Sequence, residues 1–144
     1  MSARDAVIAE AMTWLRTPYH NNARIKGAGV DCLQLLAAVY EAVGLIEHVD
    51  PQYSPDWHLH HTAELYVDGV LQFADEFEGE DPLPGDVVIW RFGRTFSHGA
   101  IVVQWPLIIH AYRGLAVELA EASDGRLRGR PMRSFRVRGI DDGR

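Results

Sequence analysis

The stretch Val30-Asp31-Cys32-Leu33-Gln34-Leu35-Leu36 holds the only cysteine of the chain and begins an apolar run. It follows a glycine-broken loop, and this pattern predicts a helix that starts at about Asp31. The first N–H groups of a helix have no partner within it, and the helix dipole is positive there. Both effects favour the thiolate of Cys32, which is the nucleophilic form. The stretch therefore predicts a cysteine nucleophile, whereas the alternative is a small buried core residue.

Two helices are predicted in this part of the chain, one that contains Cys32 and one before it. The Cys32 helix should run from about Asp31 to Val43, with Gly44 as its C-terminal cap. An earlier helix should begin after Ser2 and end before Pro18. Its apolar residues recur at helical spacing: Val7, Ile8, Ala11, Met12 and Leu15.

Other segments of the first half are less regular. Residues 19–30 and 45–56 are predicted to be loops because glycine, asparagine or proline interrupts them. Residues 57–77 are expected to be helical in one or two pieces, interrupted near Gly69. Part of the 45–80 segment could cover a site at Cys32.

Strands follow the turn signal Leu83-Pro84-Gly85-Asp86. The predicted strands are Val87–Arg91, His98–Val103, Ile108–Arg113, Ala116–Leu119 and Ser134–Arg138. Helices followed by strands with short turns predict an α+β domain, in which the N-terminal helices pack on a C-terminal antiparallel sheet. Cys32 would then lie at one end or face of the strands, and residues 140–144 should be loose.

Composition sets limits on the class of protein. The 144 residues, with 47% hydrophobic and 24% charged residues, predict one globular domain over residues 1–144. No apolar run approaches the roughly 20 residues that cross a bilayer. Residues 1–5 contain no apolar leader, so we expect a chain made in the cytoplasm without a signal peptide.

The net charge of −6 argues against a nucleic-acid partner. Arginines nevertheless gather near the C-terminus: Arg126, Arg128, Arg130, Arg133, Arg136 and Arg138. They alternate with other residues, as on the outer face of a strand, and this predicts a solvated face. A surface for a partner protein or an anionic cell-wall polymer is the alternative.

Two histidines can be placed against strand geometry. If Gln104-Trp105-Pro106 forms a hairpin loop, Ala100 opposes His110 and His98 opposes Tyr112. Both histidines then point to one side of the sheet, about 7–8 Å apart. A slip of one residue would turn His110 to the other face. Without such a site, His98 would be a surface residue at a strand edge and His110 a hydrogen-bonded core residue.

This register predicts a cysteine–histidine site. Cys32 would attack a carbonyl carbon, and His98 would hold the thiolate as an ion pair and later protonate the leaving amine. His110 would fix the orientation of His98. The backbone N–H of Cys32 would contribute to an oxyanion hole.

His58, His60 and His61 form a second histidine cluster. On a helix only His58 and His61 share a face, and no cysteine lies nearby to complete a metal site. The cluster is therefore predicted to be a solvated helix face or a wall of the substrate groove. No metal or other cofactor is expected.

Four segments resemble, in this order, the NlpC-type cell-wall peptidases: Thr17-Pro18-Tyr19, Val30-Asp31-Cys32, Leu83-Pro84-Gly85-Asp86-Val87-Val88 and Ser97-His98-Gly99-Ala100-Ile101-Val102-Val103. The resemblance implies a papain-like α+β fold and a thiol peptidase without a metal. It makes Cys32 the nucleophile, His98 the base and His110 the third polar residue. It also implies that the Tyr19 hydroxyl lies near the reacting carbonyl and that Asp31 helps to hold the substrate amine.

The family implies peptidoglycan stem peptides as substrate, and many members cleave between D-glutamate and a diamino acid. This chain carries Leu33 where members commonly have a serine associated with the substrate amine. The basic, glycine-rich loop of residues 24–29 resembles members encoded in phage and prophage tail modules, which implies tail proteins as partners and a virion tail as location. Two alternatives stay open: a non-catalytic tail component that keeps the fold, and an amidase or acyltransferase with the same residues.

Overall fold

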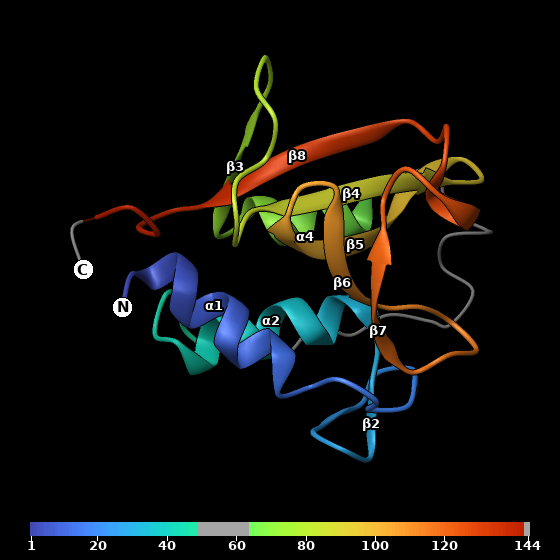
Figure 1. The fold of residues 1–144 in the computed structure, drawn as a ribbon, viewed down its shortest axis with the longest axis horizontal. Coiled ribbons are helices and arrows are strands. Elements are labelled where there is room, and N and C mark those ends of the chain that lie inside the picture. Colours follow the sequence, from blue (N-terminus) through green and yellow to red (C-terminus); the bar gives the residue numbers. More distant parts are fainter. Residues whose placement is uncertain (49–63, 143–144) are drawn as a thin grey trace.

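The computed structural model describes residues 1–48 and 64–142, and in them three α-helices pack against a six-stranded antiparallel sheet (Figure 1). The helices are α1 (Ala3–Met12), α2 (Cys32–Ala42) and α4 (Leu65–Leu71). All three contact strand β5 (Thr95–Gln104), so this strand is the centre of the packing. The α+β class predicted from the sequence is confirmed.

Helix α1 begins where the sequence predicts. The Asp5 N–H donates to Ser2 Oγ at 3.1 Å, and the Ser2 N–H donates to Asp5 Oδ2 at 3.3 Å. This capping box satisfies N–H groups that have no partner within the helix. Val7 and Ala11 are fully buried in the core that α1 shares with α2.

Helix α2 is buried along most of its length. Its N-cap is Asp31, and Gly44 follows its C-terminal end with a φ of 78°. Every residue from Cys32 to Tyr40 is buried, because α1 covers one side of the helix and strands β5 and β6 (Leu107–Ala111) cover another. The first residue of α2 is therefore fixed against the sheet.

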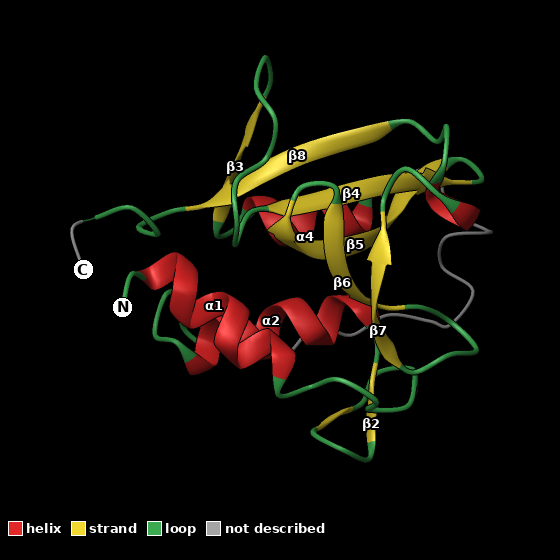
Figure 2. Ribbon diagram, in the orientation of Figure 1, coloured by secondary structure: helices red, strands yellow, loops and turns green. Residues whose placement is uncertain are grey.

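The six strands lie in the order β3-β8-β4-β5-β6-β7 (Figure 2). Their bounds are β3 Ala74–Phe77, β4 Val87–Phe92, β5 Thr95–Gln104, β6 Leu107–Ala111, β7 Val117–Glu121 and β8 Met132–Val137. Alternate residues enter two cores: Ile101 and Ile109 pack with the helices, whereas Ala100 and Ile108 pack in a second cluster with Leu127 of the 3₁₀ helix η1 (Gly125–Leu127). The five strands predicted from the sequence are confirmed, with ends shifted by up to three residues.

Four local predictions are wrong. Residues 19–30 include a short hairpin, β1 (Arg24–Ile25) paired with β2 (Gly29–Val30), rather than loop alone. Gly69 lies inside α4 and does not interrupt it, because Tyr66, Val67 and Val70 bury that helix against the sheet. Burial of these side chains outweighs the roughly 1 kcal/mol that glycine costs in a helix.

The C-terminal part of the 57–77 segment is also not helical, because Ala74–Phe77 pairs with β8 as strand β3. Ile140 is only 4% exposed, so the tail is not loose from residue 140 onwards. The neighbouring Asp141 accepts two hydrogen bonds from Arg4, which fixes this end of the chain. The histidines at 58, 60 and 61 lie outside the described residues.

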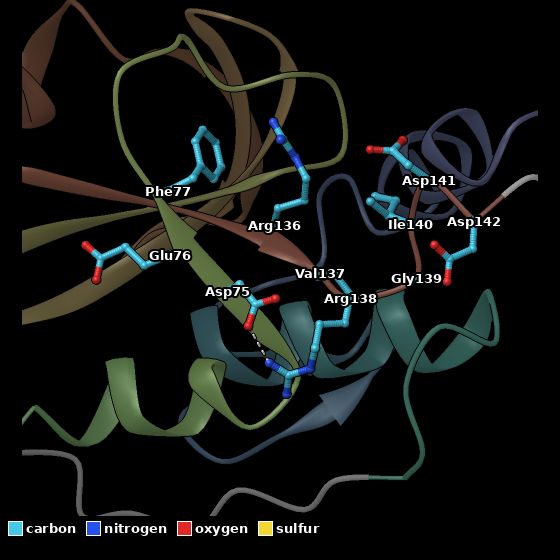
Figure 3. Close-up of a pocket in the computed structure, with 10 residues that line it drawn as sticks. All are labelled: Asp75, Glu76, Phe77, Arg136, Val137, Arg138, Gly139, Ile140, Asp141 and Asp142. Carbon is cyan, nitrogen blue, oxygen red and sulfur yellow. Dashed lines mark hydrogen bonds and ion pairs between the residues drawn. The ribbon is translucent and has the colours of Figure 1, made fainter.

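The arginines of β8 and the residue after it are paired with carboxylates. Arg133 contacts Glu76 at 2.7 Å, Arg136 contacts buried Asp86 at 2.8 Å, and Arg138 pairs with Asp75. A hollow of about 360 Å³ lies between β3, the end of β8 and the C-terminal turn, and Figure 3 shows the charged side chains around it. This face is an ion-paired surface of the sheet, and its hollow includes none of the predicted site residues.

Candidate active site

Cys32 is the first residue of α2, and its thiol faces the backbone of β5. The Sγ atom lies 3.9 Å from the carbonyl oxygen of Ser97, the residue directly before His98. The backbone N–H groups of Gly99 and Leu33 also hydrogen-bond to the sulfur. The side chain is almost enclosed, with 6% of its surface exposed. The nucleophile predicted from the sequence therefore lies against the backbone on both sides of the predicted base.

His98 and His110 meet in the way that the register predicts. Ile101 pairs with Ile109, and continuing this pairing sets Ala100 opposite His110. The Nε2 atom of His98 lies 2.8 Å from Nδ1 of His110. The observed pairing differs from the predicted register at the hairpin end. Gln104, expected in the loop, pairs with Leu107 because a β-bulge interrupts the pairing.

A carboxylate contacts the far side of the histidine pair. The Nε2 atom of His110 lies 3.1 Å from Oε2 of Glu118, which stands opposite His110 in the pairing of β6 with β7. Glu118 was not expected from the sequence. Only the pairing of β6 with β7 places Glu118 opposite His110. Predicting that pairing from the sequence requires the exact first and last residues of both strands.

Aromatic and cationic side chains surround the imidazoles. The ring centroids of Phe92 and Tyr112 lie 5.6 Å and 5.1 Å from that of His98. The guanidinium of Arg130 lies 3.7 Å from the centre of the Phe92 ring, and that of Arg126 lies 4.8 Å from the Tyr112 ring. This shell removes water from the pair and adds positive charge near it.

The enclosed environment determines the protonation states. Burial lowers the pKa of His98 well below its ordinary value, and the charges of His110 and Arg130 lower it further. Burial also lowers the pKa of His110, although its hydrogen bond to the Glu118 carboxylate opposes that shift. Both imidazoles are therefore neutral at neutral pH.

The pKa of Cys32 moves against the expectation from the helix dipole. Burial and the charge of Asp31 raise the pKa of the thiol to about 12, although the N–H groups of Gly99 and Leu33 lower it in part. Loss of solvation outweighs the helix terminus, because a charge in a dry site loses its hydration. The resting site thus holds a neutral thiol, and the expected thiolate–imidazolium pair is not its resting state.

Asp31 is the N-cap of α2. Its two carboxylate oxygens accept hydrogen bonds from the N–H groups of Gln34 at 2.8 Å and Asn22 at 2.6 Å, and the residue is fully buried. The side chain therefore holds the loop before Cys32 as well as the helix start. Its expected contact with a substrate amine stays a prediction.

Tyr19 lies beside these residues. Burial raises the pKa of its hydroxyl, and negative charge on Cys32 or Asp31 raises it further. The Tyr19 N–H donates to the Leu115 carbonyl at 2.9 Å, which holds the residue to the turn before β7. The fold thus brings Tyr19 near the thiol, as expected, and its role toward a carbonyl stays a prediction.

Tyr66 is a second residue that the sequence did not reveal. It is 1% exposed, and its buried hydroxyl lies close enough to the Cys32 thiol to lower the thiol pKa. The ring packs so closely on Gly99 that a Cβ there would lie 2.9 Å from two ring carbons. Helix α4, which belongs to the 45–80 segment, therefore lies next to the nucleophile.

No group of three or more metal-binding side chains occurs in residues 1–48 and 64–142. Within the same ranges, every helix is too short or too polar to span a membrane.

Solved structures with a similar fold include NlpC/p60 proteins. The NlpC/p60 domain of the peptidoglycan hydrolase SagA matches with a TM-score of 0.65 and 18% identity, over 90% of this chain and 96% of that one. NlpC2 from Trichomonas vaginalis matches with a TM-score of 0.70 and 17% identity, over 94% and 47%. An NLP/P60-family protein from Staphylococcus aureus gives 0.68 and 17%, over 94% and 41%.

The chain spans less than half the length of the last two proteins. No protein-family model and no curated protein sequence matches it. At such low identity the likeness concerns the fold, and it confirms the expected papain-like class.

Proposed function

We propose that this chain is a cysteine peptidase that hydrolyses an amide bond in bacterial peptidoglycan stem peptides. The observation that carries the proposal is the position of Cys32 at the start of α2, against the β5 backbone that bears His98. The hydrogen bond between His98 and His110 supports the base in a fixed orientation. The fold, shared with the SagA peptidoglycan hydrolase domain, adds the substrate class.

The reaction begins from a neutral pair. As the Cys32 sulfur attacks the carbonyl carbon, His98 takes the thiol proton, so no thiolate has to form in advance. The Cys32 N–H, at the first position of α2, donates to the developing oxyanion. The Tyr19 hydroxyl lies nearby and would donate to the same oxygen.

His98 then returns the proton to the leaving amine as the C–N bond breaks, and a thioester remains on Cys32. Water attacks the thioester carbon and gives one proton to His98. The C–S bond breaks, the acid product leaves, and the sulfur takes the proton back from His98. No metal takes part in these steps.

The finer specificity rests on the resemblance seen in the sequence. We infer the bond between D-glutamate and a diamino acid as the target, with Asp31 near the substrate amine. The loop of residues 24–29 supports a role in a phage or prophage tail. An acyltransferase would use the same steps but pass the acyl group to an amine instead of water.

The experiment is incubation of purified muropeptides with the chain and separation of the products by mass. Hydrolysis by the wild type, lost in Cys32→Ala, is the expected result. Products extended by an added amine would instead identify a transferase. No turnover of any stem peptide would contradict the proposal.

A non-catalytic tail component is the second candidate. It is favoured by one observation: the thiol is 6% exposed, with a pKa of about 12. If Cys32 reacts with iodoacetamide no faster in the wild type than in His98→Ala at any pH, this candidate gains and the peptidase fails.

A further inference from the structure

Glu118 approaches the buried histidines from the solvent side. Its side chain is 43% exposed, whereas that of His110 is 4% exposed. It stands at the wall of a hollow of about 260 Å³ that His110, Tyr112 and Arg126 also line. Its Oε2 atom lies 3.1 Å from Nε2 of His110, within hydrogen-bond distance. A solvent-facing acceptor therefore contacts the far end of the pair.

This contact determines where the protons of both rings lie. A carboxylate only accepts hydrogen bonds, so Nε2 of His110 must carry the hydrogen. A neutral imidazole has one hydrogen, and Nδ1 of His110 is then an acceptor. The Nε2 atom of His98, 2.8 Å away, must donate to it. Nδ1 of His98 is left without a hydrogen and can accept the thiol proton.

The hydrogen bond between the histidines does not by itself determine which ring nitrogens carry the hydrogens. In the reversed arrangement, Nδ1 of His110 donates to Nε2 of His98, and the hydrogen of His98 lies on Nδ1. The same two atoms are then bonded, but His98 cannot accept a proton at Nδ1. The two arrangements differ in what happens at Nε2 of His110, where Glu118 lies.

We propose that Glu118 is a positioning residue, which fixes the tautomers of His98 and His110 and so keeps Nδ1 of His98 ready as a base. The use of that base rests on the proposed peptidase function, whereas the tautomers do not. When His98 takes the Cys32 proton, its Nε2–H still donates to His110, and no proton leaves His110. The Glu118 charge offsets the nearby Arg126 and Arg130, both of which disfavour a protonated imidazole.

The test is ¹⁵N NMR of histidine-labelled protein without substrate, which distinguishes protonated from bare ring nitrogens. The wild type should show hydrogen on Nε2 of both His98 and His110. In Glu118→Gln, whose amide can accept or donate, both tautomers should appear. Glu118→Lys only donates, so the hydrogens should move to Nδ1. Glu121→Gln is the matched control, since it removes an exposed carboxylate from the same strand and hollow, and it should keep the wild-type tautomers.

Activity gives the second readout. Glu118→Gln should lower kcat about 3–10-fold and leave KM unchanged, because only the base is affected. Unchanged tautomers in both Glu118 variants, or an equal change in Glu121→Gln, would overturn the inference. A tautomer shift in a chain that hydrolyses no stem peptide would support the inference and contradict the proposed function.

Discussion

The Nε2 atom of His98 lies 2.8 Å from the Nδ1 atom of His110, and each ring is less than a tenth exposed. Two buried imidazoles at this distance share one hydrogen, so the pair acts as a unit rather than as two separate bases. The carbonyl oxygen of Ser97, directly before His98, lies 3.9 Å from the Cys32 sulfur, and Glu118 lies 3.1 Å from Nε2 of His110.

This unit predicts how Cys32 responds to alkylation. Because the thiol is neutral at rest, its reaction with iodoacetamide depends on proton transfer to His98. At about pH 8, His98→Gln should slow alkylation at least tenfold. His48→Gln, which changes an exposed histidine beside Glu41, should leave the rate unchanged. Equal rates in the wild type and His98→Gln would show that His98 does not act on this thiol.

The contact of Gly99 with Tyr66 predicts a packing defect. A methyl group at Gly99 would lie 2.9 Å from two carbons of the Tyr66 ring, which is 1% exposed and has little room to move. Gly99→Ala should therefore destabilise the fold by about 1–3 kcal/mol and displace Tyr66 from the thiol. Urea unfolding measures the first effect, and the Cys32 alkylation rate measures the second.

Gly69→Ala is the matched control for this substitution. Nothing lies within 4 Å of a Cβ at Gly69, and the residue is inside α4. The change should stabilise the chain by about 0.5–1 kcal/mol, because alanine favours the helix. A stabilising effect of Gly99→Ala would contradict the packing described at β5.

Much of the fold follows from local patterns in the sequence. The capping residues Ser2 and Asp31 mark two helix starts, because short polar side chains satisfy the first N–H groups of a helix. Alternation marks β4, β5 and β6, since each of these strands buries one set of residues in each core. The register of β5 with β6, and with it the meeting of His98 and His110, follows from a short hairpin loop.

The remaining features depend on tertiary contacts. The raised pKa of Cys32 comes from burial beneath β5 and α4, whereas the sequence shows only the helix start. Glu118 and Tyr66 reach the site through strand pairing and helix docking, and neither carries a local motif. Gly69 remains helical because its neighbours are buried. Intrinsic helix propensity does not include this tertiary effect.

Asp31 allows stability and thiol chemistry to be separated. Asp31→Ala removes the acceptor for the N–H groups of Gln34 and Asn22, and should cost about 2–3 kcal/mol in urea unfolding. Asp31→Asn keeps one acceptor oxygen and should cost less. Both changes remove a charge that raises the pKa of Cys32, so that pKa should fall in both variants. A Cys32 titration that stays fixed in Asp31→Asn would contradict the electrostatic part of this account.

The buried histidines also make stability depend on pH in a definite direction. The pKa of His98 is lower in the folded chain than its ordinary value of 6.5, so below that pH the unfolded chain binds a proton that the folded chain refuses. The His98 contribution to stability is therefore complete above about pH 6.5 and is lost as the pH falls. For each such group the slope is at most about 1.4 kcal/mol per pH unit, and His110 adds in the same direction.

The measurement is urea unfolding of the wild type and His98→Gln between about pH 5 and pH 7.5. Glutamine does not titrate, so the variant should lose less stability over this range than the wild type, even where its stability at pH 7.5 is lower. A near-ultraviolet circular dichroism spectrum at each pH verifies that both chains start from a folded state. Parallel stability curves would mean that His98 binds its proton equally well in the folded and unfolded chain. The imidazole would then lie in water, and the dry neutral pair that the proposed mechanism needs would not exist.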